Sequence, residues 1–61
     1  FSYNVNEYLK IKLRAAEAVL DLAGDAIDLA IAQPSETHAN EATLLVAEAK
    51  VLTTEIAILA S

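Results

Sequence analysis

The chain has 61 residues, of which 56% are hydrophobic, and its formal net charge is −5 at pH 7. A chain of this length makes at most one small domain, and a domain of that size buries only about 60% of its unfolded surface. The acidic balance excludes a nucleic-acid partner, because phosphate binding needs a basic face.

Cysteines and membrane-span signals are both missing from the sequence. Without cysteine there is no disulfide framework or thiolate metal site, and the redox compartment is left open. No apolar run approaches the roughly 18 residues of a membrane span. Residues 1–10 lack the basic-then-apolar order of a signal peptide. We therefore expect a cytoplasmic chain with no membrane partner, and the missing initiator Met predicts a processed, cleaved or fragmentary protein.

Residues 5–32 are predicted to form one helix, roughly 40 Å long at 1.5 Å per residue. Its apolar positions recur at steps of three and four, the period of one stripe on an α-helix. They are Leu9, Leu13, Ala16, Leu20, Ala23, Ile27 and Ile31. Other apolar residues, Ile11, Leu22 and Leu29, stand nearly opposite Leu9. The apolar arc is about 200° wide, whereas an ordinary surface helix has a stripe of a little over 100°. This helix is therefore expected to pack on two sides.

Six charged residues of the first helix share one arc. They are Glu17, Asp21, Asp25 and Asp28, together with Lys10 and Arg14. We interpret this arc as the solvated face of the helix, and a surface for a cation or a basic segment of a partner is the alternative. Gly24 costs about 1 kcal/mol relative to Ala in mid-helix. We interpret it as a mark of a close helix crossing rather than as a ligand contact.

The stretch "QPSET" is predicted to be the turn of a helical hairpin, with residues 33–35 at its centre. Pro34 cannot donate a backbone hydrogen bond and pushes Gln33 out of helical geometry, so the first helix should stop near Ala32. Ser35 and Thr37 are both natural N-caps for the next helix. A connection this short makes the two helices antiparallel.

His38 and Glu41 have the i, i+3 spacing of two metal ligands on a helix. Helical di-iron sites, however, draw several carboxylates and two such pairs from four helices. This chain has one histidine, in the first turn of a helix. We therefore interpret His38 as a solvated residue near the partly negative C-terminal end of the first helix, and no metal site is expected.

Residues 36–61 are predicted to form the second helix. Its first stripe comprises Ala42, Leu45, Ala49, Leu52, Ile56 and Leu59. A second stripe of Leu44, Val51 and Ile58 runs beside it, with Glu41, Glu48 and Glu55 between or alongside the two. Neither half of the chain alternates with period two, so no strand is expected. One hairpin cannot cover both sides of both helices. The predicted fold is all-α, an antiparallel helical hairpin that forms part of a four-helix bundle.

Residues 44–61, "LLVAEAKVLTTEIAILAS", resemble the penultimate long helix in the C-terminal domain of acyl-CoA dehydrogenases. The resemblance is greatest to the branch that includes flavin-dependent monooxygenases of the dibenzothiophene-desulfurising type. There an Ala-rich helix with a Lys near its middle runs into a small-residue segment and a glycine pair. Residues 8–28, "YLKIKLRAAEAVLDLAGDAID", are similar to the helix before it, where an Arg followed by small residues is common. The resemblance covers about residues 5–61.

This resemblance implies a flavoprotein whose C-terminal four-helix bundle packs in a tetramer and helps to enclose FAD. The family's flavin-contacting Arg and Phe-Gly segment would lie upstream of the chain. The glycine pair would follow Ser61, and the base that removes a substrate proton would lie further on. No catalytic, cofactor-binding or metal-binding residue is therefore expected within these 61 residues, and FAD is implied for the parent protein alone.

Two hypotheses about function follow. In the first, the chain is a fragment of an FAD-dependent acyl-CoA dehydrogenase-like or flavin monooxygenase-like oxidoreductase, and it contributes bundle packing and subunit contacts. In the second, it is a self-associating helical-hairpin module that forms a dimeric four-helix bundle without enzymatic activity. Both need further helices of the same protein or of another copy, which predicts a homo-oligomer. A membrane-surface helix is disfavoured by the acidic charge.

Overall fold

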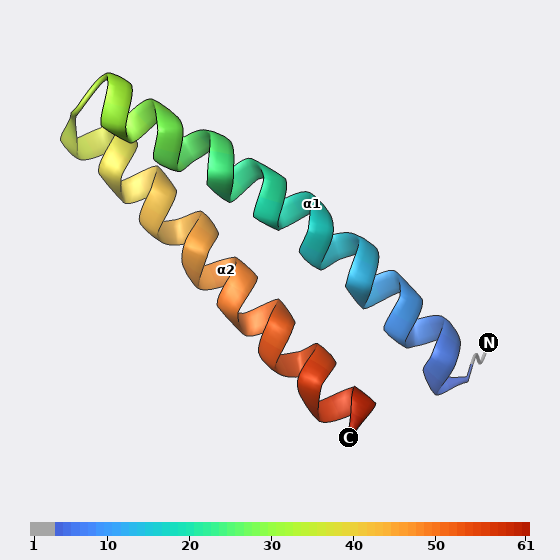
Figure 1. Ribbon diagram of the computed structural model, residues 1–61. Helices are drawn as coiled ribbons and strands as arrows, with labels where there is room; N and C mark the ends of the chain where they lie inside the picture. The colour runs from blue at the N-terminus through green and yellow to red at the C-terminus, as the bar shows by residue number, and fades with distance from the viewer. Residues whose placement is uncertain (1–3) are drawn as a thin grey trace.

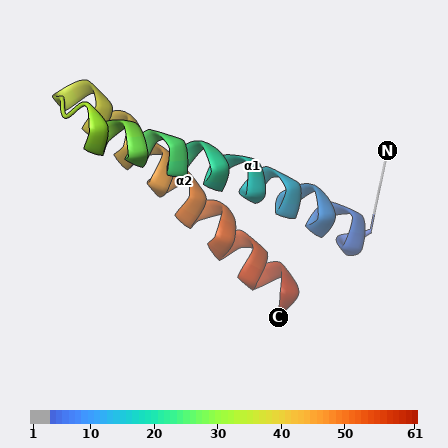
Figure 2. The ribbon, with the colours of Figure 1, turned by 45° about the horizontal axis from the view of Figure 1, so that its top comes forward.

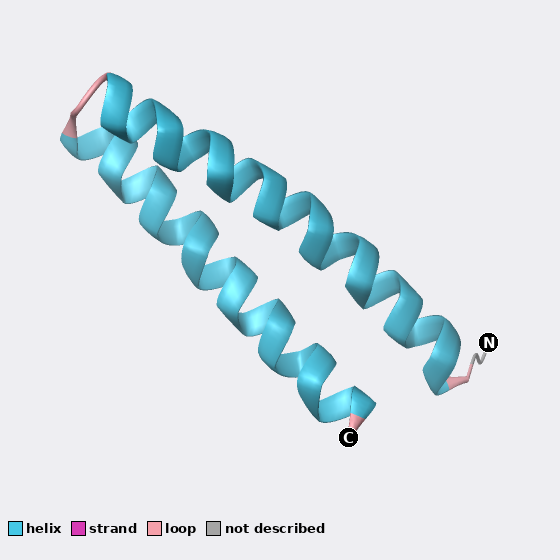
Figure 3. Cartoon of the chain, in the orientation of Figure 1, coloured by secondary structure: helices cyan, strands magenta, loops and turns pink. Residues whose placement is uncertain are grey.

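The computed structural model describes residues 4–61, which form two antiparallel helices joined by a short turn (Figure 1). α1 spans Val5–Ala32 and α2 spans Glu36–Ala60. Figure 3 shows helix throughout the described residues except at the turn and at the two ends, with no strand among them. The prediction of an all-α helical hairpin is confirmed. The helices begin and end within one residue of the bounds that the periodicity predicts.

A polar cap starts α1. The Asn4 side chain accepts a hydrogen bond from the backbone N–H of Glu7, with 2.9 Å between the two atoms. This bond satisfies one of the N–H groups that a helix leaves unpaired in its first turn. The carboxylate of Glu7 lies in the same turn, where a negative charge is favoured by the helix dipole. Asn4 therefore fixes where α1 begins.

The turn forms where Pro34 breaks the helical pattern. Gln33 leaves helical geometry, with φ −133° and ψ 75°, while its N–H still donates to the Leu29 carbonyl at 2.8 Å. Ser35 is the N-cap of α2: its Oγ accepts a hydrogen bond from the backbone N–H of His38 at 3.0 Å. Of the two candidate caps, the structure therefore uses Ser35 rather than Thr37.

Alanine forms the core between the helices. The buried side chains are Ala16, Ala23, Ala42 and Ala49. On each helix the two alanines are seven residues apart, so they lie on one line two turns apart. Small side chains on this line let the helices lie close together near the turn, and Figure 2 shows them separating toward the two chain ends. The hairpin is a thin rod, 44 × 17 × 16 Å.

Candidate helix-packing surface

The buried side chains of the hairpin are all small, and most of its large apolar side chains are exposed. Beside the four buried alanines, the exposed large apolar residues are Val5, Ile11, Leu13, Leu20, Leu22, Ile27, Leu29, Ile31, Leu44, Val46, Val51 and Ile58. Single exposed leucines are common on soluble proteins, but contiguous apolar patches of several hundred Å² mark interaction sites. Here the exposed residues follow the helices in lines, so the surface has the pattern of a helix-packing face.

The accessible surface is large for the mass of the chain. The hairpin exposes 4654 Å², whereas a compact monomer of 6.5 kDa exposes about 3,800 Å². The excess is about 800 Å², which is roughly what each partner buries in a standard protein–protein interface. The elongated hairpin therefore exposes more surface than a compact protein of its mass.

One groove follows the junction of the two helices, and we call it the Leu20 groove. It is lined by Leu13, Ala16, Glu17, Leu20 and Asp21 of α1, and by Thr53 and Ile56 of α2. Leu13 and Leu20 are about half exposed, at 48% and 51%. Both leucines belong to the same predicted stripe of α1 as Ala16 and Ala23. Only the two alanines of that stripe are buried against α2. This flank of α1 is therefore not covered by α2.

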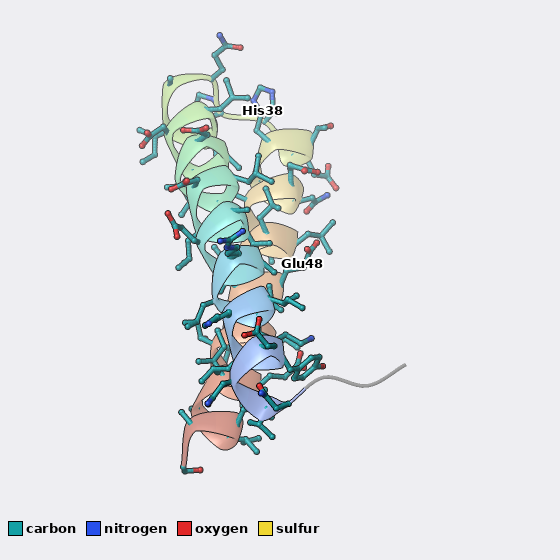
Figure 4. All side chains as sticks on the ribbon, turned by 90° about the vertical axis from the view of Figure 1, so that its right-hand side faces the viewer. His38 and Glu48 are labelled. Carbon is teal, nitrogen blue, oxygen red and sulfur yellow. The ribbon has the colours of Figure 1, made fainter. Side chains whose placement is uncertain are left out.

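A second groove lies on α2, and we call it the Val51 groove. It is lined by Leu44, Ala47, Glu48, Val51 and Leu52. Leu52 is half-buried toward α1, whereas Leu44 and Val51 are 61% and 60% exposed. Glu48, labelled in Figure 4 near the middle of α2, supplies the only ionisable side chain of this groove. The two predicted stripes of α2 therefore have different surroundings, and α1 covers only one of them.

The strongest polar contact between the helices is an ion pair. Nζ of Lys12 lies 3.0 Å from Oε2 of Glu55 and 5.3 Å from the centre of the Tyr8 ring. The hydrogen bond to the Glu55 carboxylate raises the pKa of Lys12 above its ordinary value, and the bond to Tyr8 acts in the same direction. This pair joins the two helices in the half of the hairpin away from the turn.

The predicted charged arc of α1 is solvated. Its six members, Lys10, Arg14, Glu17, Asp21, Asp25 and Asp28, are all exposed. Lys10 also pairs with Glu7 at 3.3 Å. Gly24 is exposed as well, and a Cβ built on it would meet no atom within 4 Å. The interpretation of Gly24 as a close crossing is therefore wrong for the contact between α1 and α2.

His38 has a structural partner in the turn. Its Nδ1 lies 2.5 Å from the carbonyl oxygen of Gln33, and the ring is half-buried at the turn end of the hairpin (Figure 4). A carbonyl only accepts, so Nδ1 carries the proton and donates. The interpretation of His38 as a solvated side chain near the end of α1 is thus refined: it donates to the C-cap carbonyl of that helix. Within residues 4–61, His38 and Glu41 do not belong to any group of three or more potential metal ligands.

The two grooves are lined by acidic rather than basic side chains. A flavin nucleotide needs donors for its ring and pyrophosphate oxygens. The charged side chains of the grooves are instead carboxylates, Glu48 in one and Glu17 and Asp21 in the other. A carboxylate accepts hydrogen bonds and repels a pyrophosphate. No helix among the described residues is both long and apolar enough to cross a bilayer.

Comparison with known proteins adds no relative. No protein-family model matches the chain, and neither a curated protein nor a solved structure matches it. The resemblance of residues 8–28 and 44–61 to acyl-CoA dehydrogenases therefore stays a prediction from the sequence.

Two contacts of the structure are not predicted from the sequence pattern, the Lys12–Glu55 ion pair and the Asn4 cap. The Lys12–Glu55 pair joins residues 43 positions apart, and no local spacing connects them. The cap at Asn4 has a clearer signal, because an Asn directly before a helical segment with Glu in its first turn is typical of a helix start. Periodicity also leaves open which part of a wide apolar arc faces the neighbouring helix.

Proposed function

We propose that the chain is a helix-packing module whose function is to associate with further helices in a bundle. The single observation that carries this proposal is the inverted burial: four alanines are buried, while twelve larger apolar residues are exposed. A free hairpin would keep these side chains in water, at a cost of about 25 cal/mol per Å² of apolar surface that a partner would cover. Association removes that cost.

The proposal is tested by unfolding at several chain concentrations. Folding that is coupled to association is stabilised by mass action, so the unfolding midpoint rises with concentration. We expect the urea midpoint, followed by helical circular dichroism, to increase over a hundredfold range of chain concentration. A cooperative transition with the same midpoint at every concentration would contradict the proposal.

A second candidate is the bundle segment of an FAD-dependent oxidoreductase related to acyl-CoA dehydrogenases. The observation that favours it is the exposed stripe of Leu44, Val51 and Ile58, on a part of α2 that α1 leaves uncovered. In a larger four-helix domain, other helices of the same protein would cover this stripe. Its test is the absorption spectrum of the longest purified protein that contains this chain. A bound flavin supports the candidate, and a colourless folded protein contradicts it.

We also propose that the module works in the cytoplasm. A net charge of −5 keeps a small, apolar-rich protein in solution before its partner binds. Subcellular fractionation with an antibody to the chain tests this location, and recovery in a secreted fraction would contradict it.

A further inference from the structure

We propose that a second copy of this chain covers the Leu20 groove, related to the first by a twofold axis parallel to the helices. In this arrangement α1 of each hairpin packs antiparallel to α2 of the other. The inference rests on the proposed function, because it names the partner of one packing face. Three observations carry it: the register of the hairpin, the sizes of the side chains and the position of two charges.

The Lys12–Glu55 pair defines which residues of the two helices are level. The helices are antiparallel, so we count forward from Lys12 along α1 and backward from Glu55 along α2. After the same number of residues the two counts reach positions at the same height along the hairpin. Glu17, five positions after Lys12, is therefore level with Lys50. Rotation about an axis parallel to the helices moves no residue along that axis. A residue of α1 that is level with a given α2 residue in its own hairpin is therefore level with the same α2 residue of the second copy. Those two residues face each other across the interface.

The larger side chains of α1 then meet smaller ones of α2. Leu13, Leu20 and Ile27 are spaced by seven and form one exposed line on α1. Thr53 lines the Leu20 groove, and Val46 and Ala39 precede it by seven and fourteen residues on the same line of α2.

The two lines match in register as well as in size. The level pairs across the twofold axis are Leu13 with Thr53, Leu20 with Val46 and Ile27 with Ala39, each within one residue of the level set by Lys12 and Glu55. Alternation of large and small side chains across facing positions lets helix surfaces interdigitate. The groove face is therefore complementary to itself in this arrangement.

Charge complementarity points to the same arrangement. Glu17 lines the groove at its α1 edge, and both Glu17 and Lys50 are exposed. Lys50 lies one turn before Thr53, and the Thr53 hydroxyl donates a hydrogen bond to the Lys50 carbonyl at 3.1 Å. Because residues three apart are neighbours on a helix surface, Lys50 lies along the α2 edge of the Leu20 groove. Within residues 4–61 the ion pairs are Lys10–Glu7 and Lys12–Glu55, so neither Glu17 nor Lys50 has an ion-pair partner in its own hairpin. The twofold axis brings Glu17 of each copy to Lys50 of the other.

A twofold axis perpendicular to the helices is the competing arrangement of the same face. It would pack α1 on the α1 of the partner and bring Leu20 against its own copy. Lys50 would then face the α2 of the partner, where the nearest level residues are apolar or uncharged. The parallel axis gives a partner both to the line of Leu13, Leu20 and Ile27 and to Lys50.

Two single-cysteine variants distinguish the axes, because the chain has no cysteine of its own. Leu20→Cys and Val46→Cys are purified reduced, mixed, allowed to exchange subunits and then oxidised. We expect the mixed disulfide between the two variants to form at least tenfold faster than either self-disulfide. A dominant Leu20→Cys self-disulfide would overturn the parallel axis, and equal formation of all products would overturn this face as the interface.

A charge exchange gives an independent readout on surface residues that leave the hairpin fold intact. Glu17→Lys and Lys50→Glu should each raise the dimer dissociation constant about tenfold, since each affects two symmetric exposed pairs. The double exchange should return the constant to within about threefold of wild type. Additive weakening in the double variant would overturn the proposed pair.

Failure of this inference differs from failure of the proposed function. A chain that associates but gives neither the mixed disulfide nor the charge compensation contradicts only the second-copy arrangement. A chain that folds cooperatively as a monomer contradicts both.

Discussion

Lys12 of α1 and Glu55 of α2 are joined by an ion pair of 3.0 Å that spans the two helices of the hairpin. The Tyr8 ring lies under the same ammonium group, 5.3 Å from Nζ to the ring centre, which adds a cation–π contact. The buried residues between the helices are alanines, flanked by half-buried larger side chains such as Leu52. The ion pair adds a polar contact beside this apolar packing, and exposed pairs of this kind contribute little to stability.

The pair predicts a pH dependence of stability. The folded-state pKa of Lys12 is raised above the ordinary value of 10.5, so its contribution is fully present below that value and is lost as the pH rises through the folded pKa. We expect Glu55→Gln to lower Tm at pH 8, and the difference from wild type to vanish at pH values well above 10.5.

NMR titration of the Lys12 amine gives a direct control for this prediction. The Lys12 pKa should fall in Glu55→Gln relative to wild type, because the largest cause of the raised value has been removed. An unchanged pKa in the variant would show that the pair is not formed in solution.

The close approach at the alanine core predicts a strong effect of size. Ala23 is 4% exposed, and a larger side chain there would push the helices apart. Ala23→Leu should destabilise the hairpin by about 1–3 kcal/mol, as overpacking usually does. The matched control is Ala18→Leu, on an exposed position of the same helix, where the change should be within about 0.5 kcal/mol. Equal effects of the two variants in urea melts would show that the helices do not pack through alanine.

The turn predicts a measurable role for His38. Removing its hydrogen bond to the Gln33 carbonyl leaves an exposed acceptor, so His38→Ala should cost about 0.5–1.5 kcal/mol. Loss of the Ser35 cap in Ser35→Ala should cost about 1 kcal/mol. Asn40→Ala, at an exposed position of the same helix, serves as the control. If the His38→Ala melt coincides with that of wild type, the hydrogen bond of His38 does not contribute to stability, and His38 is a solvated residue.

The helices and the turn could be predicted from the sequence because their causes are local. Pro34 ends one helix and Ser35 starts the next, and both effects act within a few residues. The choice of packing face could not be predicted. The apolar arc of α1 includes Leu20 as well as Ala23, and periodicity gives both the same weight. The structure packs α1 and α2 through alanine because two small residues per helix, two turns apart, permit a close contact that leucine would prevent.

The two stripes of α2 predict different effects of truncation. Leu52 is half-buried toward α1, so Leu52→Ala should cost about 2–5 kcal/mol wherever the hairpin folds. Val51 is 60% exposed in the hairpin. Val51→Ala should therefore be costly only where another helix covers the Val51 groove, as in the flavoenzyme candidate.

Thermal melts of both variants in the longest protein that folds distinguish these cases. A silent Val51→Ala beside a destabilising Leu52→Ala would place the Val51 groove outside any packed interface and would contradict the flavoenzyme candidate. A loss of stability in both variants would support two-sided burial of α2.

Sedimentation equilibrium of the 61-residue chain tests most directly whether its exposed apolar faces are packing surfaces. One chain has a mass of 6.5 kDa. We predict that the measured mass at micromolar concentration is twice that of one chain or a larger multiple, and that it falls toward the monomer on dilution together with the helical signal. A mass of 6.5 kDa at every concentration, with a full helical signal and a cooperative melt, would contradict the account.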